Sequence, residues 1–570
     1  MHYYSLCIAV AGLLVTRPVV GSRHGKTPFG RDLQLLAQLG ISPDLRGFGH
    51  HDLQQLVSHS AMATALEAET ITIPLDHDNS SAGTYENRFW VNDEFFEPGK
   101  PIMLYDAGET NAEATAYAHL TSSLSFFRPM LEEFHAMGIV WEHRYYGEST
   151  PCSIDFDTPP ETLKYLDTKQ SLADIPYFAR NFSRESYPDV DLTPQGTPWI
   201  MVGGSYAGVR AALTRNEYPE TIFAAFSSSA PVEARMNMTM YFDQIYRGMI
   251  ASGWTNCTLD IRAALNYIDD QLSSDETASS IKRLFFGSGA ENNTNGDFTA
   301  ALTGIYGFFQ NYGMAGGTGG LGSFCKYLET DPNTNKTAGA DGLATIYGNK
   351  FMAERWAQWP VFTELVNENM DTNCQMLNTS RTLDCDFSKP YGDASAISWT
   401  WQYCSEWGFY QANNEGPHAL LSRYQTLEYQ QEVCNRQFPS AIPKGLLPPQ
   451  PLTEELNHEH GGWTIRPSNV YFSGGEFDPW RSLSLLSTED VAPQGIQFSS
   501  QIPDCGVKTT QDTVFGYIME NSEHCFDFQA AETVGKLSRG IFTSALLQWL
   551  PCFGQQTAVH PTRLEGEGAV

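Results

Sequence analysis

Residues 203–208, Gly-Gly-Ser-Tyr-Ala-Gly, constrain this chain more than any other stretch. They follow the apolar run Trp199–Val202, which is typical of a buried strand, and they precede Val209–Glu217, which has helical character. A serine between a strand and a helix, with small neighbours, occupies a sharp, strained turn that presents its side chain at the carboxyl end of a sheet. The pattern therefore predicts that Ser205 is a nucleophile on an α/β sheet.

Short apolar runs alternate with helical stretches on both sides of this turn. The predicted strands are Glu69–Pro74, Arg88–Val91, Pro101–Tyr105, Gly138–Glu142, Trp199–Val202, Phe223–Ser227, Asn469–Phe472 and Thr513–Met519. Between the sixth and seventh strands the rhythm changes to helical runs such as Leu259–Leu272 and Ala353–Glu368, and a last helix is predicted from Gln529 to about Trp549. Strands alternating with helices indicate an α/β sheet. We expect one sheet domain interrupted by a large helical insertion.

The length of 570 residues suits two lobes better than one ordinary domain. The predicted division is a signal peptide at 1–22, an N-terminal extension or pro-segment at 23–66, the first part of the sheet domain at 67–235, a helical insertion (cap) domain at 236–440, the second part of the sheet domain at 441–555 and a C-terminal tail at 556–570.

Charge and the first residues indicate the compartment. A net charge of −31 disfavours nucleic acid and anionic membranes as partners, because phosphate contacts need excess Lys and Arg. The apolar run Leu6–Val15 and the small residues before Ser22 resemble a secretory signal, with a buried N-terminal helix as the alternative. No other stretch is long and apolar enough to span a bilayer. We expect a secreted protein, or alternatively one of the vacuolar or lysosomal lumen.

Cysteines and glycosylation sequons agree with export. Removal of Cys7 with the signal leaves ten cysteines, an even set that permits complete disulfide pairing, and none forms a CxxC pair. Seven sequons would be glycan acceptors in a secreted chain. They begin at Asn79, Asn181, Asn237, Asn256, Asn292, Asn335 and Asn378.

A hydrolytic serine needs a base and a residue that orients the base. In the α/β-hydrolase fold these follow in the chain order Ser, Asp or Glu, His. Asp478 lies in a Gly-rich turn after the seventh strand, and His524 lies in a loop after the eighth. His524 would accept the Ser205 proton, and Asp478 would hold the imidazole tautomer. For the oxyanion we expect the backbone N–H groups of Tyr206 and Gly108.

Three other motifs are weaker candidates for a functional site. Residues 317–322 fit G-x-G-x-x-G but lack a preceding strand, so a surface loop is favoured over a dinucleotide site. His458 and His460 lack further ligands nearby, and a solvated loop is favoured over a metal site. His143 precedes the serine in the chain and does not fit the order of a base.

These residues resemble the prolyl carboxypeptidase and dipeptidyl peptidase II family of serine peptidases, the lysosomal Pro-Xaa carboxypeptidase group, from about Thr70 onward. The stretches that carry the resemblance are Pro74–His77, Asn87–Val91, the string Glu142–Ser149 (Glu-His-Arg-Tyr-Tyr-Gly-Glu-Ser), Gly203–Gly208, Arg215–Pro219, Ser229–Pro231, Trp401–Phe409 and Asp478–Trp480. The chain departs from the family at Val209–Leu213, Ala107–Thr110 and Cys525, which leaves the pocket shape open.

The resemblance implies an α/β-hydrolase domain with a helical cap and cleavage on the carboxyl side of proline. Ser205, Asp478 and His524 fall on the family's triad positions, and Trp480 is expected to wall a proline pocket. Family members are often dimers, so a homodimer is possible for this chain. No metal or organic cofactor is expected.

The hypothesis is a secreted serine peptidase that acts through an acyl-enzyme, carboxypeptidase-like or prolyl-endopeptidase-like, on proline-containing peptides. The alternatives are a dipeptidyl aminopeptidase, an esterase or lipase on the same fold and, more remotely, a catalytically silent binding protein. The substrate end stays open at this point. Glu109, Glu113 or an acid of the insertion could bind an amine, and Arg210 or Arg481 could bind a carboxylate.

Overall fold

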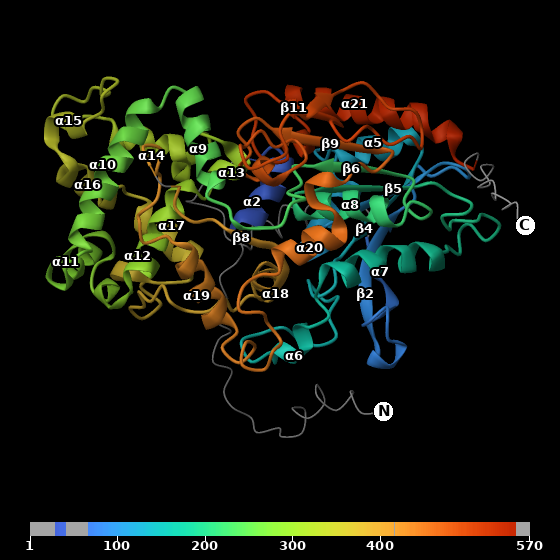
Figure 1. The fold of residues 1–570 in the computed structure, drawn as a ribbon, viewed down its shortest axis with the longest axis horizontal. Helices are drawn as coiled ribbons and strands as arrows, with labels where there is room; N and C mark the ends of the chain where they lie inside the picture. Colours follow the sequence, from blue (N-terminus) through green and yellow to red (C-terminus); the bar gives the residue numbers. More distant parts are fainter. Residues whose placement is uncertain (1–28, 42–65, 415, 555–570) are drawn as a thin grey trace, which may run out of the picture.

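The computed structural model describes residues 29–41, 66–414 and 416–554. The predicted signal peptide, most of the N-terminal extension and the tail 556–570 lie outside the described residues. Figure 1 shows a lobe built on a twisted sheet beside a lobe made of helices.

The first lobe is built on a nine-stranded sheet, counted over the described residues, in the order β1-β2-β4-β3-β5-β6-β9-β11-β10. Its strands are β1 (Glu69–Pro74), β2 (Thr84–Asn92), β3 (Ile102–Asp106), β4 (Met137–Trp141), β5 (Trp199–Gly204), β6 (Ala224–Ser228), β9 (Val470–Gly475), β10 (Gln497–Ser499) and β11 (Thr513–Met519). β2 runs antiparallel to β1 and β4, and all other neighbours are parallel. This is an α/β-hydrolase sheet, as predicted. The sequence pattern misses only β10, a three-residue edge strand.

Helices cover both faces of this sheet (Figure 1). Alternate residues of β3 point to opposite faces, as in any strand. Ile102 and Leu104 belong to the same core as residues of α7 (Thr168–Asn181) and α8 (Tyr206–Glu217). Met103 and Tyr105 belong to the core formed with α4 (Ala112–Thr121), α5 (Phe127–Phe134) and α21 (Thr533–Trp549). Burial on two faces explains why the central strands read as continuous apolar runs.

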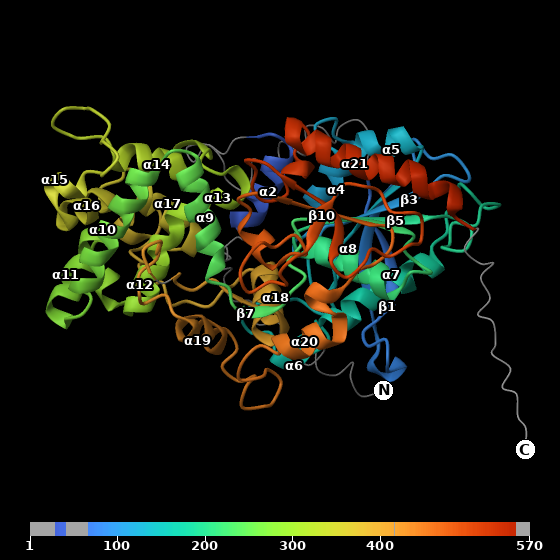
Figure 2. The same ribbon diagram turned by 45° about the horizontal axis from the view of Figure 1, so that its top comes forward.

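The second lobe lies between β6 and β9 in the chain and is largely helical (Figure 2). Its α-helices are α9 (Met240–Ala251), α10 (Thr255–Gln271), α11 (Asp275–Phe286), α12 (Asn295–Leu302), α13 (Phe309–Tyr312), α14 (Leu321–Leu328), α15 (Ala344–Tyr347), α16 (Asn349–Ala357), α17 (Phe362–Met370), α18 (Ala394–Gln402) and α19 (Leu427–Gln437). The pair β7 (Arg235–Asn237) and β8 (Gly408–Tyr410) joins its beginning to a late segment. The predicted boundaries at 236 and 440 remain predictions.

One helix prediction in this lobe is wrong in extent. The run Ala353–Glu368, expected as one helix, is divided between α16 and α17. Pro360 lies in the break. Proline has no N–H to donate and its ring clashes with the preceding turn, so it ends a helix that the apolar pattern alone would continue.

Four disulfides are formed: Cys257–Cys325, Cys374–Cys385, Cys404–Cys434 and Cys505–Cys552. The expectation of complete pairing is wrong for Cys525, which is a buried thiol beside His524. Its Sγ accepts a hydrogen bond from Gln34 Nε2 at 3.6 Å. The even count therefore did not determine the pairing.

One predicted glycan acceptor differs from the others in its surroundings. Asn256 is 9% exposed, and its side chain accepts the N–H of Cys257. Its glycosylation remains a prediction, and this burial makes it the least favourable of the seven sites. The other six sequon asparagines are exposed, and their glycosylation remains a prediction. They are Asn79, Asn181, Asn237, Asn292, Asn335 and Asn378.

Part of the predicted N-terminal extension is ordered as α2 (Phe29–Gln38), which lies between the two lobes (Figure 1). Gln38 Oε1 and His119 Nε2 are 3.0 Å apart, and the hydroxyl of Tyr312 donates to the carbonyl of Ile41 at 2.9 Å. This helix therefore contacts both the sheet lobe and the helical lobe. Whether residues 23–66 are removed as a pro-segment remains open.

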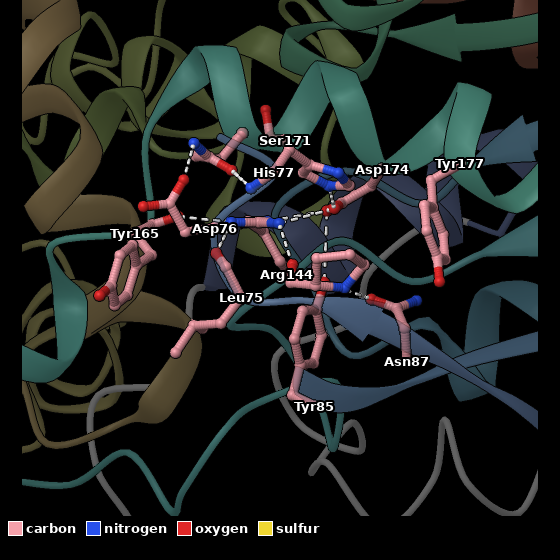
Figure 3. Close-up of polar contacts among 12 residues, drawn as sticks. Leu75, Asp76, His77, Tyr85, Asn87, Arg144, Tyr165, Ser171, Asp174 and Tyr177 are labelled. Carbon is pink, nitrogen blue, oxygen red and sulfur yellow. Dashed lines mark hydrogen bonds and ion pairs between the residues drawn. The ribbon is translucent and has the colours of Figure 1, made fainter. Parts of the chain in front are cut away.

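Arg144, within the family-like string Glu142–Ser149, belongs to a buried polar cluster. Figure 3 shows Arg144 lying against Asp174, with His77 and Tyr85 directed at the same carboxylate. Arg144 donates to both oxygens of Asp174 at 2.7 and 2.6 Å, and both side chains are fully buried. Burial would raise the pKa of Asp174, but Arg144 and His77 lower it to about 2. Arg144 thus stabilises the sheet lobe through a buried ion pair with Asp174.

We predict that Arg144→Met lowers the free energy of unfolding by about 3–5 kcal/mol, because it leaves the Asp174 charge buried without its cation. Urea unfolding measures the change. The matched control is Arg180→Met on α7, whose partner Glu220 is exposed, and its expected change is below about 1 kcal/mol. Equal small losses in both variants would contradict the structural role of Arg144.

The turn between β5 and α8 is strained and closely packed. Ser205 has φ 61° and ψ −131°, a conformation that residues with a side chain rarely adopt. A Cβ on Gly203 would lie 2.2 Å from the Ala207 carbonyl oxygen, and one on Gly208 would lie 2.8 Å from the Ser228 carbonyl oxygen. The glycines are therefore required because the helix starts against the strand that precedes it and against β6.

We expect Gly203→Ala to lower stability by about 1–3 kcal/mol, since the added methyl overlaps backbone atoms that cannot move independently. Differential scanning calorimetry compares it with Gly540→Ala, where a Cβ on α21 meets nothing within 4 Å. That control should gain about 0.4–1 kcal/mol by restricting the unfolded chain. A neutral Gly203→Ala would show that the turn is less constrained than its geometry indicates.

Candidate active site

Ser205 stands at the carboxyl end of the central strand β5. Its N–H donates to the carbonyl of Ser228, the last residue of β6, at 2.9 Å. Only 9% of the residue's surface is exposed. The neighbouring strand thus fixes the backbone of the serine that the sequence predicted as a nucleophile.

Asp478 and His524 come from the two loops that follow β9 and β11. His524 Nδ1 lies 2.9 Å from Asp478 Oδ1, and both side chains are fully buried. The same Asp478 oxygen accepts the N–H of Trp480 at 2.9 Å, which caps a short 3₁₀ helix, η8 (Pro479–Leu483). His524 Nε2 is buried and has no hydrogen-bond partner among the described residues. The structure thus brings His524 and Asp478 together across 46 residues and leaves the second ring nitrogen available.

Two opposing effects act on the His524 imidazole. Burial disfavours its charged form and lowers the pKa, but the Asp478 carboxylate outweighs burial and raises the pKa well above its ordinary value of 6.5. The pair therefore stabilises a protonated histidine, which is the state formed when the ring accepts a proton.

The helical lobe holds the histidine loop through Gln310, a residue that sequence reasoning missed. The carbonyl of Gln310 accepts the N–H of His524 at 3.0 Å. Its side-chain Oε1 accepts from Trp480 Nε1 at 2.8 Å and from the Tyr241 hydroxyl at 3.0 Å. A glutamine within a short helix has no signature in sequence, because its partners lie 170 or more residues away or in another helix.

The two predicted oxyanion donors differ in their surroundings. The N–H of Gly108 donates to Asp106 Oδ1 at 2.9 Å, so binding an oxyanion would require sharing that hydrogen between two acceptors. The Tyr206 backbone opens α8, where N–H groups have no partner within the helix. Both assignments remain predictions. The N–H of Tyr206, unlike that of Gly108, would not have to be shared with Asp106.

The Tyr206 side chain is part of a buried polar network. Its hydroxyl accepts from Gln402 Nε2 at 2.7 Å and lies 3.3 Å from His143 Nε2. Burial, followed by the charge of Arg210, lowers the pKa of His143 well below 6.5. His143 is therefore a neutral structural residue beneath the nucleophile turn, in agreement with its exclusion as the base.

Aromatic rings enclose a cavity of about 450 Å³ beside this site. Trp480 packs edge-to-face on Phe409 with ring centroids 5.2 Å apart, and Trp399 lies 5.6 Å from the Tyr206 ring. Trp480, Phe409 and Trp399 all line the cavity. Trp480 comes from the loop that carries Asp478, whereas Phe409 and Trp399 come from the insertion, so the cavity forms only when the two parts of the chain meet.

A second, more polar cavity of about 1080 Å³ lies within the helical lobe. Gln425 lines both cavities. The two spaces are therefore adjacent, and the second offers room beyond the aromatic walls.

Neither arginine considered for a substrate carboxylate is available for that role. Arg210 is buried, pairs with Asp106 and donates to the Ser171 carbonyl at 2.8 Å. Arg481 is buried and donates to backbone carbonyls that include those of Gly475 and Leu486. Both arginines fix local backbone. Glu113 is exposed on α4, and Glu109 lines a small space beside α2.

The competing motifs have structural explanations. Residues 317–319 form a 3₁₀ turn before α14, with no strand ahead of them. The expected loop around His458 and His460 is wrong, because both lie on α20 (Thr453–His460). His460 is buried, and its Nδ1 lies 2.6 Å from Glu217 Oε1, so a tertiary ion pair explains it.

Within the described ranges no three His, Cys, Asp or Glu side chains group as metal ligands, and no helix is long and apolar enough to cross a bilayer.

Comparison with known proteins identifies the family. The family model described as serine carboxypeptidase S28 matches residues 74–536. A probable extracellular serine carboxypeptidase of Arthroderma benhamiae is 27% identical over 79% of this chain, which spans 64% of that relative's length. A lysosomal Pro-X carboxypeptidase of Mus musculus is 26% identical over 70% of this chain and 74% of the relative.

Among solved structures, an esterase from Pyrobaculum calidifontis aligns with 35% of this chain and 58% of its own, at 15% identity and a TM-score of 0.21. This loose alignment adds nothing to the topology already described. The family match covers most of the chain, including the strands and the loops that carry Ser205, Asp478 and His524. The chain therefore belongs to the serine carboxypeptidase S28 family of serine-type peptidases.

Proposed function

We propose that this protein hydrolyses peptide bonds on the carboxyl side of proline, with Ser205 as nucleophile, His524 as base and Asp478 as the residue that orients the base. The observation that carries the proposal is the buried His524–Asp478 hydrogen bond of 2.9 Å. It lies on the loops after β9 and β11, at the sheet end where the strained turn presents Ser205. Family membership supports the same assignment.

The reaction would proceed through an acyl-enzyme. Ser205 Oγ attacks the scissile carbonyl carbon while His524 Nε2 takes its proton, and the carbonyl electrons move to oxygen. Collapse of the tetrahedral intermediate breaks the C–N bond, and the imidazolium gives its proton to the leaving amine. Water then repeats the sequence on the ester. Asp478 keeps Nδ1 protonated and stabilises the imidazolium throughout.

The aromatic cavity supports a preference for proline. A pyrrolidine ring is compact and apolar, so flat rings can bury it, and its fixed φ presents the next bond in one direction. Trp480 lies two residues after Asp478 in the chain, and its ring centroid is 6.5 Å from that of His524. A proline seated against Trp480 and Phe409 would therefore present its own carbonyl carbon to the reacting groups.

Charge along the same cavity supports a carboxypeptidase. Its described lining includes the cations Lys389 and Arg436 and contains neither Asp nor Glu, although the chain carries a net charge of −31. Each cation has an acidic partner outside the lining, Asp384 and Asp297. A substrate carboxylate would meet cations here, whereas the amine of a dipeptidyl aminopeptidase substrate would meet no acid.

A prolyl endopeptidase is the second candidate, favoured by the adjacent polar cavity of about 1080 Å³. That space could hold peptide residues beyond the aromatic walls. An esterase or lipase is less well supported, since the helical lobe is stabilised by three disulfides and contains four exposed sequon asparagines. A silent binding protein is disfavoured because all three candidate catalytic residues are present.

We further propose a secreted, glycosylated protein. One relative is named as extracellular and another as lysosomal, and both names are compatible with a secretory route. The disulfides and the six exposed sequon asparagines support the same route.

The test is a set of proline peptides that are blocked at both ends, free only at the amine, or free only at the carboxylate. We expect cleavage after proline for the peptide with a free carboxylate, measured by mass spectrometry of the products. Ser205→Ala should lose activity by a factor of at least about 10⁴. Trp480→Ala should reduce the preference for proline over alanine at the cleaved residue. The matched control is Trp254→Ala, a tryptophan distant from Trp480 in the sequence, which should leave this preference unchanged.

The other outcomes discriminate between the functions. Cleavage of the doubly blocked peptide would establish the endopeptidase, and cleavage only with a free amine would establish the aminopeptidase. Rapid ester turnover without peptide cleavage would favour the esterase. Unchanged activity in Ser205→Ala would refute the proposed nucleophile.

A second prediction concerns pH. The base must be neutral, so kcat/KM should rise with pH through the raised pKa of His524 in the free protein. Asp478→Asn removes the largest of the charge effects that raise this pKa, whereas burial, which lowers it, remains. The ascending limb of the pH profile should therefore move to lower pH while kcat falls on the order of 10⁴-fold. Glu476→Gln, two residues away in the same turn, should leave the limb in place. An unmoved limb in Asp478→Asn would contradict the pairing.

A further inference from the structure

A second buried carboxylate lies three residues after His524. Asp527 is fully buried and accepts three serine hydroxyls: Ser228 Oγ donates to its Oδ1 at 2.6 Å, Ser538 Oγ donates to its Oδ2 at 3.1 Å, and Ser473 Oγ also donates to Oδ2. These serines come from β6, α21 and β9. Because each carboxylate oxygen accepts hydroxyl protons, the geometry suits an acceptor-only group.

Two of the three serines are on strands that hold the other catalytic residues. The carbonyl of Ser228 accepts the N–H of Ser205 at 2.9 Å. Ser473 lies on β9, five residues before Asp478, and pairs in register with Ser228. Asp527 itself belongs to the loop of His524. One carboxylate is therefore bonded to the strand that supports the nucleophile and to the strand that leads to the orienting acid.

A neighbouring contact reinforces this arrangement. The N–H of Cys525 donates to Ser229 Oγ at 2.9 Å, and the N–H of Ser229 donates to the carbonyl of Ser473 at 2.8 Å. The loop that carries His524 is thus attached to β6 and β9 on both sides of Phe526. Burial raises the pKa of Asp527. The loss of any one hydroxyl would leave a buried carboxylate less well satisfied.

We propose that Asp527 is a positioning residue that sets the relative placement of Ser205, Asp478 and His524. The proposal rests on the proposed function, because it concerns the geometry of that triad. Asp527 touches neither substrate nor reacting atoms. It acts through the hydroxyls of Ser228 and Ser473, whereas Ser538 joins it to α21 and to the hydroxyl of Tyr471, which lies on β9 farther from Asp478 than Ser473 does.

The three serines allow a matched test on one carboxylate. Ser228→Ala, Ser473→Ala and Ser538→Ala each remove one hydroxyl from Asp527. If Asp527 is a positioning residue, the first two should lower kcat roughly three- to tenfold with KM nearly unchanged, because the substrate cavity is untouched. Ser538→Ala should keep wild-type kcat. A purely structural carboxylate would lower thermal stability in all three variants without separating their kcat values, and that result would overturn the proposal.

Covalent labelling with a fluorophosphonate provides a readout that does not depend on the peptide substrate. The labelling rate should fall in Ser228→Ala, Ser473→Ala and Asp527→Asn, each measured well below its own melting temperature. Asp260→Asn is the control, a buried acid in the helical lobe that accepts two backbone N–H groups. It should lose stability but label at the wild-type rate.

The outcomes separate the two proposals. A wild-type protein that is not labelled at Ser205 would refute the proposed function. Normal labelling of the wild type together with equal rates in Ser228→Ala, Ser473→Ala and Ser538→Ala would refute only the role of Asp527. If Asp527→Asn fails to fold, the single serine variants still decide the question, because each preserves the carboxylate.

Discussion

The structure depends on the strained turn at Ser205. A residue with φ 61° and ψ −131° persists only where its surroundings hold it, and here they are the Ser228 carbonyl on β6 and the close start of α8 against β5. The glycines at 203 and 208 are a consequence, since a methyl at either would meet backbone atoms. The same strand that holds the turn also carries the hydroxyl bonded to Asp527.

The helical lobe completes the site rather than merely covering it. Gln310 holds the backbone of His524 and the indole of Trp480, and Gln402 donates to the Tyr206 hydroxyl. The cavity walls come from both lobes, since Trp480 lies on the sheet side and Phe409 in the insertion. In the proposed function, substrate selection and the alignment of the triad therefore depend on the same lobe contacts, and a change in the helical lobe would affect both.

Sequence periodicity predicted the sheet well because its central strands are buried on both faces and its turns are marked by glycine. β1 and β11 begin and end at the predicted residues. The prediction from apolar periodicity failed where a local residue interrupted the apolar run or where an element was too short to show a period. Pro360 divides a run that looks like one helix, β10 is three residues long, and α20 forms where a loop was expected. Cys525 and Asn256 show that counting cysteines and sequons does not determine burial.

By itself, the sequence determined the α/β-hydrolase sheet, the family and the three residues assigned to the triad, since apolar periodicity, chain order and local motifs are all written along the chain. Only the tertiary structure decided which charges are structural, as for Arg210 and Arg481, and which distant groups hold the site, as for Gln310 and Asp527. The physical reason is that hydrogen bonds and burial between residues tens to hundreds of positions apart are properties of packing. A nucleophile turn is local, whereas the alignment of its base and the walls of its pocket exist only once both lobes have folded together.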